Sequence, residues 1–204
     1  MIYTCDSVTS DTLSNELLQK LELFVSNQQN EHHDHPAVIN MGHNPYTGLL
    51  WNIQKQHRWQ SAQGSIAILL HSDKIVGLSC VELSDEYKNF NITIGGVRCW
   101  LDKRHRTENQ VTKYLLSQNL SWSIKQKADA MMLTFNDYNK IIYDTIRNKT
   151  QGRAAGLGKI WSSWWNNCIC ISRPLIVRNT AQWCVLKPIN ELVTLQIAKE
   201  LEYD

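Results

Sequence analysis

The sequence predicts an α/β (α+β) fold, with a mixed and mostly antiparallel sheet, a central parallel pair of strands and flanking helices. Apolar runs at 65–71, 75–83 and 90–101 are separated by short polar breaks, which is typical of an antiparallel meander. A helical pattern at 108–127 then leads to a further apolar run at 129–135. Because a crossover helix joins strands that run parallel, the strands at 90–101 and 129–135 are expected to form the parallel pair.

Two helices are predicted ahead of the meander. Apolar residues recur at spacings of three and four over 10–26, and Ser10 or Asp11 can cap a helix there. The segment 27–48 is polar and holds two prolines and two glycines, so it is expected to be a long loop. A shorter helix is expected at 49–59.

The chain after the parallel pair is expected to close the sheet with two more strands. A helix is predicted at 138–148, and a segment with three glycines and three tryptophans follows at 149–167. The strands are predicted at 168–178 and 181–189, and a helix-like tail covers 190–202. The glycines at 95 and 96 predict a β-bulge, or a place where another backbone or a ligand comes close.

Length and composition predict one domain. Residues 1–64 are expected to be N-terminal helices and a loop of that domain, 65–190 its core with the insertion 149–167, and 191–204 a C-terminal tail. Hydrophobic residues make up 43% of the chain, which argues against disorder as a whole. The formal charge of +2 argues against a general nucleic-acid-binding protein.

The N-terminal sequence predicts a cytoplasmic protein with no membrane partner. It lacks the basic region and the apolar run of a signal peptide. No window approaches the roughly 20 apolar residues that a membrane-spanning helix needs. In that compartment thiols stay reduced, so the six cysteines are expected to be free, buried thiols. Cys168 and Cys170 lack the CxxC spacing of a zinc site.

The stretch "CWLDKRHRTENQVTKYLL" at 99–116 passes from a strand through a basic turn into a helix. The unpaired N–H groups and the dipole of a helix N-terminus favour an anion, so this turn is a candidate phosphate site. It contains no glycine, although glycine lets a backbone approach phosphate closely. A solvated basic turn is the alternative interpretation, and the sequence leaves both open.

The order of the elements and two motifs resemble the GNAT superfamily of N-acetyltransferases, over roughly 65–190. In that family the strand before the turn ends in apolar residues followed by an arginine, which Leu101 and Arg106 match. Asn109 and Val111 stand where the family places small residues in its coenzyme A turn. In the second motif, Asn136 and Tyr143 have the family's spacing after the next strand.

The resemblance implies an acyl-CoA-dependent N-acetyltransferase that takes acetyl-CoA and an unknown amine as substrates. It implies that Tyr143 is the catalytic general acid for the leaving thiolate. The implied coenzyme contacts are Leu101, Arg106, Thr107, Asn109, Val111 and Asn136. For the general base, the sequence offers only the surface carboxylates Glu82 and Asp85, neither of which is a firm candidate.

A second function stays open beside the enzyme: a non-catalytic protein of the same fold that has lost coenzyme A binding. The glycine-free turn, the missing base and the tryptophan-rich insertion motivate it. Trp161, Trp164 and Trp165 are spaced as on a helix, either as a buried face or as a contact for a protein partner or a second copy.

One further cluster, "EHHDHP", groups His32, His33, Asp34 and His35. Adjacent residues of a loop rarely converge on one ion without a distant partner, so no metal site is predicted there.

Overall fold

The computed structural model describes nine stretches of the chain, which are residues 3–9, 12–32, 64–84, 89–105, 111–148, 153–154, 158–159, 163–177 and 180–203. The expected helix at 49–59, most of the expected loop, and the cluster His33–His35 lie outside them.

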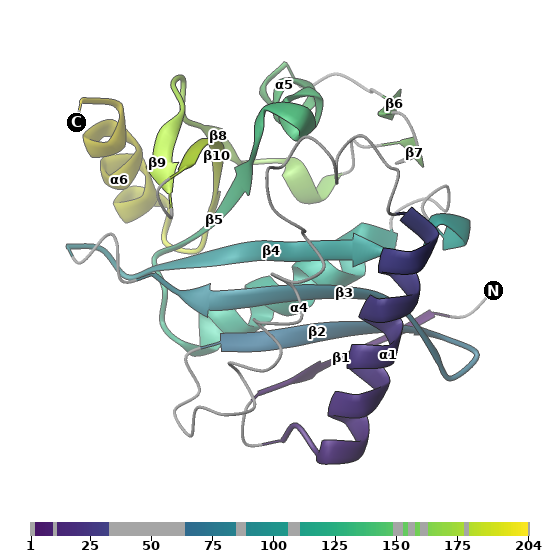
Figure 1. The fold of residues 1–204 in the computed structure, drawn as a ribbon. Helices are drawn as coiled ribbons and strands as arrows, with labels where there is room; N and C mark the ends of the chain where they lie inside the picture. Colours follow the sequence, from purple (N-terminus) through teal and green to yellow (C-terminus); the bar gives the residue numbers. More distant parts are fainter. Residues whose placement is uncertain are drawn as a thin grey trace.

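The predicted meander is confirmed. Strands β2 (Gly64–His71), β3 (Lys74–Leu83) and β4 (Ile92–Leu101) pair antiparallel in sequence order. The helix α4 (Val111–Lys125) then crosses the sheet, and β5 (Ala130–Phe135) returns parallel to β4, as expected of a crossover connection. The mixed, mostly antiparallel sheet with the parallel pair β4–β5 is therefore the predicted fold class (Figure 1).

Over the described residues the main sheet has eight strands, in the order β1-β2-β3-β4-β5-β10-β8 with β9 beside β10. Strand β1 (Tyr3–Val8) was not expected from the sequence, since it contains few apolar residues. It pairs with β2 along its whole length, and its side chains alternate between half-buried and exposed over most of it. Alternation of half-buried and exposed side chains is typical of an edge strand that is covered on one face only.

The first helix differs from its expected bounds. α1 spans Asn15–His32, so it starts later than predicted and replaces the first residues of the expected loop. Its cap is Ser14, whose Oγ accepts a hydrogen bond from the N–H of Leu17 at 3.2 Å. The part of the helix beyond the predicted end is held against the sheet by Gln28. This side chain is buried and accepts a hydrogen bond from Trp100 Nε1 at 2.9 Å.

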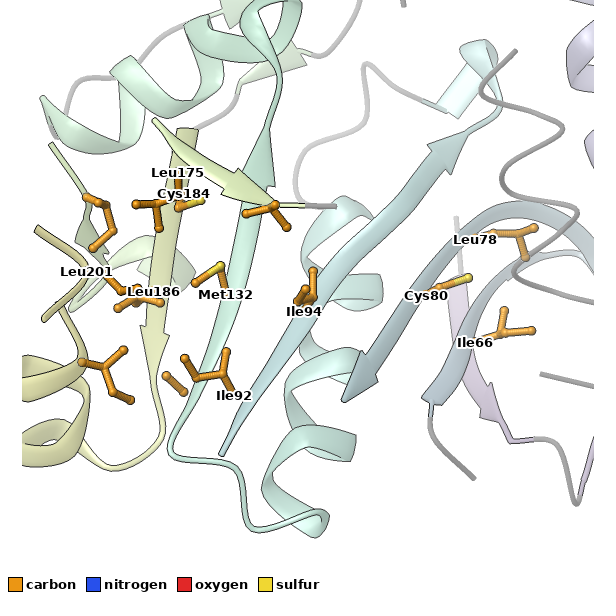
Figure 2. Packing of buried hydrophobic residues seen from close by; sticks show 14 of the residues in the cluster. Ile66, Leu78, Cys80, Ile92, Ile94, Met132, Leu175, Cys184, Leu186 and Leu201 are labelled. Atoms are coloured by element: carbon orange, nitrogen blue, oxygen red, sulfur yellow. The ribbon is translucent and has the colours of Figure 1, made fainter. Parts of the chain in front are cut away.

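Helices cover both faces of the sheet (Figure 1). α1 and α6 (Glu191–Tyr203) share one core with the sheet, and α4 and α5 (Lys140–Arg147) pack on the opposite face. Strand residues alternate between the two cores, so β5 is buried on both faces from Ala130 to Leu133, as its apolar run predicted. Figure 2 shows the first core, whose labelled side chains come from β2, β3, β4, β5, β9, β10 and α6.

The first of the two predicted C-terminal strands is divided, and the second is present within one residue of its predicted bounds. The expected strand at 168–178 is divided into β8 (Ile169–Cys170) and β9 (Leu175–Val177), which both pair with β10 (Thr180–Pro188). Pro174 cannot donate to a ladder, and Ser172 is instead bonded through its N–H and hydroxyl to the carboxylate of Glu202 on α6. The tail is therefore a packed helix, with Ile197 fully buried.

The remaining short elements lie in the connections. They are the 3-10 turns η1 (Lys103–His105), η2 (Asp137–Asn139) and η3 (Ser163–Trp165), and the two-stranded sheet of β6 (Arg153–Ala154) and β7 (Gly158–Lys159). All six cysteines are free thiols, and burial raises the pKa of Cys168 to about 12. In the stretches that are described, no helix has the length and apolarity needed to cross a bilayer.

Candidate active site

The parallel pair at the centre of the sheet separates after four residues. The ladder between β4 and β5 runs from Ile92↔Ala130 to Gly95↔Leu133 and ends there. β4 continues to Leu101 while remaining paired with β3, and β5 turns toward β10. Figure 2 shows the two strands moving apart beyond Ile94 and Met132. This divergence places one edge of β4 away from its parallel neighbour in the middle of the sheet.

β-Bulges in β4 accompany the divergence. β3 advances two residues where β4 advances three, first between Trp100 and Val97 and again between Val97 and Ile94. The second irregularity contains the glycines at 95 and 96, so the bulge predicted there is confirmed. A bulge bends its strand and increases the local twist, which is the physical reason that β4 leaves β5 at this point.

Gly95 also lies in close contact with the neighbouring strand. A Cβ atom added to Gly95 would overlap the side chain of Met131, with Cγ only 2.7 Å away. Met131 is fully buried on the α4 face. Any larger residue at position 95 would therefore force the Met131 side chain to move.

A buried polar network holds α4 against β3 and β4 beside this point. Asn119 donates through Nδ2 to Ser79 Oγ at 2.7 Å, and Ser123 Oγ donates to the carbonyl of Asn119 at 2.9 Å. Thr93, on β4, donates to Ser123 Oγ at 2.6 Å. These residues were missed from the sequence, although Asn119 and Ser123 share a helix face with apolar neighbours. Ile124, an apolar residue in the helical pattern at 108–127, is 54% exposed.

The chain leaves β4 through a turn built on Asp102. Its buried carboxylate accepts from the N–H of Arg104 at 2.9 Å, from Nε at 3.0 Å and from Nη2 at 2.6 Å. The Asp102 N–H donates to the carbonyl of Val76 at 2.8 Å. Hydrogen bonding from the Arg104 side chain holds the pKa of Asp102 below its ordinary value, against the opposing effect of burial.

Replacement of Asp102 by alanine is expected to lower the free energy of unfolding by about 2–3 kcal/mol, because hydrogen bonds to a charged acceptor are lost. The pKa of the Asp102 carboxyl is lower in the folded protein than in the unfolded chain. The stability that this carboxylate contributes is therefore fully present above the unfolded-state pKa, and it is lost as the pH falls through the folded-state pKa. In urea denaturation, the stability difference between wild type and variant should therefore begin to shrink as the pH falls below about 4 and should vanish only below the folded pKa. The exposed carboxylate variant Asp6→Ala is the control, and an Asp102→Ala effect no larger than that of the control would contradict the expectation.

The residues predicted to bind coenzyme A are only partly described. Arg106, Thr107 and Asn109 lie outside the described residues. Leu101 and Val111 have buried side chains in one apolar cluster, at the end of β4 and the start of α4. These two residues could reach a coenzyme only through their backbone. The first turn of α4 contains no acidic residue that would oppose an anion.

Asn136 and Tyr143, the second predicted motif, both make contacts within the protein. Asn136 Oδ1 accepts from the N–H of Asn139 at 3.0 Å and so caps η2. Tyr143 is fully buried, and its hydroxyl donates to the carbonyl of Ile171 at 2.5 Å. Ile171 follows β8, which is separated from β4 by β5 and β10. Burial is the main cause that raises the pKa of Tyr143.

A charged and aromatic cluster lies at the end of β5, and its one sign in the sequence is a helical Lys–Asp spacing. The Nζ atom of Lys140 lies 2.7 Å from both carboxylate oxygens of Asp144 and 4.6 Å from the centre of the Trp183 ring. Trp183 Nε1 donates to Asp137 at 3.0 Å. These contacts fix the start of α5 relative to β10.

The tryptophan-rich segment is described in part. Trp164 and Trp165 are each 8% exposed and contact each other edge to face, which favours the interpretation as a buried cluster. Lys187 Nζ donates to the carbonyls of Trp164, at 2.5 Å, and Asn166. Trp161 and the candidate base Asp85 lie outside the described residues. Glu82, the other candidate base, is half-buried near the end of β3, opposite Ile94.

Comparison with known proteins identifies this architecture. No family model matches the chain, and no curated protein matches it in sequence. Solved structures do match. A GNAT-family acetyltransferase from Staphylococcus aureus aligns with a TM-score of 0.54 and 16% identity, covering 91% of this chain and 99% of its own. ElaA of Escherichia coli aligns with a TM-score of 0.53 and 12% identity, with the same coverage.

An acetyltransferase from Streptococcus agalactiae aligns with a TM-score of 0.52 and 14% identity, over 91% of this chain and 98% of its own. These identities are low, so what the likeness shows is the fold. The fold expected from the resemblance is confirmed.

Proposed function

Since the chain has the fold of the GNAT N-acetyltransferases, we propose that it transfers an acetyl group from acetyl-CoA to an amine. The observation that carries this proposal is the divergence of β4 and β5 after Gly95. A strand that leaves its neighbour within a sheet offers backbone donors and acceptors to an extended ligand, as in β-strand addition. The pantetheine arm of coenzyme A has two amides and is such a ligand.

The phosphates of the coenzyme would then lie at the connection from β4 to α4. The first N–H groups of a 15-residue helix favour an anion, and this helix has no acid in its first turn. Asp102 sets the direction in which the chain leaves β4. Arg106, Thr107, Asn109 and the N–H of Val111 remain the proposed phosphate contacts.

In the reaction, the amine nitrogen attacks the thioester carbonyl, a C–N bond forms and the C–S bond breaks. The amine loses a proton, and the coenzyme A thiolate gains one. Tyr143 was expected to supply that second proton. Its hydroxyl is engaged with Ile171 beside β8, so acting as the acid would require this hydrogen bond to break first. We therefore assign Tyr143 to the positioning of α5.

The non-catalytic alternative has lost one of its motivations. Trp164 and Trp165 are packed inside the protein rather than presented to a partner. The divergence of β4 and β5, moreover, is the feature that coenzyme binding needs.

Calorimetry and thermal unfolding with acetyl-CoA provide the test. A hundredfold excess over Kd is expected to add about 2.7 kcal/mol to the free energy of unfolding. Pantetheine alone, which lacks the phosphates, should bind more weakly. Release of free thiol is then measured with a panel of primary amines. If acetyl-CoA neither binds nor raises the Tm, the proposal fails.

A further inference from the structure

Three aromatic rings that carry metal-ligating atoms meet at the end of the sheet where β4 gives way to η1. Tyr3 begins β1, His71 ends β2 and His105 ends η1. The ring centres of Tyr3 and His71 are 5.0 Å apart, those of His71 and His105 are 5.1 Å apart, and those of Tyr3 and His105 are 5.7 Å apart. The hydroxyl oxygen of Tyr3 lies 2.8 Å from Nδ1 of His105.

The fold brings these rings together from distant parts of the chain. Tyr3 and His71 are paired across the β1–β2 ladder. His105 arrives because the N–H of His105 donates to the carbonyl of Asp102 at 2.9 Å, which closes the turn after β4. All three side chains are half-buried, so solvent and ions can still reach them.

We propose that Tyr3, His71 and His105 form a binding site for a divalent transition-metal ion, best suited to Cu²⁺. Imidazole nitrogen is the commonest protein ligand for such ions, and a phenol oxygen can complete the set with water. The Tyr3 hydroxyl and His105 Nδ1 are a hydrogen-bonded pair 2.8 Å apart, so a bound ion would take the place of the proton that they share. Sites with nitrogen and oxygen ligands bind Cu²⁺ more tightly than Zn²⁺, so Cu²⁺ is favoured over Zn²⁺.

The charged side chains nearest the site are either paired with each other or exposed to solvent. The carboxylate of Asp102 is bonded to Arg104 and is not a ligand. Lys74 faces His71 across the β2–β3 ladder, and its long side chain can extend into solvent. In the described residues no group of three or more His, Cys, Asp or Glu side chains could hold a metal, so the third protein ligand of this site is the phenol of Tyr3.

A bound ion would join the edge strand β1 to the turn that follows β4. Tyr3 also packs against the small core that contains Leu101 and Val111. The ion is therefore expected to stabilise the start of α4 together with β1. This inference does not depend on the proposed acetyl transfer.

The test uses the full chain without a histidine tag, titrated with Cu²⁺ and followed by calorimetry, thermal unfolding and electron paramagnetic resonance. The wild type is expected to bind Cu²⁺ through nitrogen ligands and to gain in Tm. The double variant His71→Gln/His105→Gln should bind one ion fewer per chain and lose that gain. Tyr3→Phe should keep the ion with about tenfold weaker affinity.

His33→Gln/His35→Gln is the matched control, because it removes two histidines of the other cluster and should retain the site. If Cu²⁺ binding is unchanged in His71→Gln/His105→Gln, the site does not exist, whatever the control shows. If His71→Gln/His105→Gln fails to fold, nuclear magnetic resonance of the wild type decides instead. Substoichiometric Cu²⁺ should then selectively broaden the ring signals of His71 and His105. Absence of that broadening also overturns the site.

Discussion

Replacement of Gly95 by alanine is expected to lower the free energy of unfolding by about 1–3 kcal/mol and to weaken acetyl-CoA binding. The added methyl group would overlap Met131, which is fully buried between β5 and α4. Relief of the overlap must displace the buried Met131 side chain and so disturbs the packing at the residue where the two strands part. Urea denaturation measures the first effect, and calorimetry with acetyl-CoA measures the second.

A double-mutant cycle identifies the cause of the Gly95→Ala effect. Met131→Ala alone should destabilise the protein by about 2–5 kcal/mol through the cavity that it leaves. Combined with Gly95→Ala, it should cost less than the sum of the two single changes, because the new methyl group then has space. Simple additivity would show that the overlap with Met131 is not the cause.

Val185→Ala provides the control for coenzyme binding. Val185 is fully buried in the same core, on β10, so its truncation should reduce stability without changing the β4–β5 divergence. Acetyl-CoA affinity is expected to be unchanged in Val185→Ala and reduced in Gly95→Ala. Equal losses in both variants would mean that the coenzyme responds only to overall stability.

Replacement of Tyr143 by phenylalanine is expected to destabilise the protein by about 1–3 kcal/mol while leaving most of the activity of the folded enzyme. The change removes the hydroxyl that donates to the carbonyl of Ile171. Ile171 is fully buried, so its carbonyl would lose this hydrogen bond without gaining one from water. Because the hydroxyl lies beside β8, the acetyl-transfer rate at saturating substrates should fall by less than about threefold, whereas loss of a general acid typically costs 10²-fold or more.

The measurement of Tyr143→Phe separates the two roles of this residue. Activity is compared at a temperature well below the Tm of both proteins, with the folded fraction taken from circular dichroism. A pH profile of the rate should have the same shape in both. A rate loss of 10²-fold with an altered profile would establish Tyr143 as the proton donor and contradict its assignment to packing.

Local patterns determined the order and type of most elements. Alternating and continuous apolar runs predicted β2 to β5, and the intervening helix made β4 and β5 parallel. The glycine pair at 95 and 96 predicted the irregularity of β4. These features depend on residues close together in the sequence, where backbone preferences and side-chain periodicity act directly. The unexpected β1 and the two parts of the divided C-terminal strand are short segments whose pairing depends on neighbouring strands.

Only the tertiary structure decided how distant groups meet. The sequence places an asparagine and a tyrosine at the spacing of a known motif, but the strand order β5-β10-β8 determines that the hydroxyl of Tyr143 meets Ile171. Tyr3 and His105 are 102 residues apart and meet because β1 pairs at the sheet edge and η1 turns back after β4. Side-chain convergence over such separations follows from sheet order, twist and bulges, and local sequence patterns do not specify these.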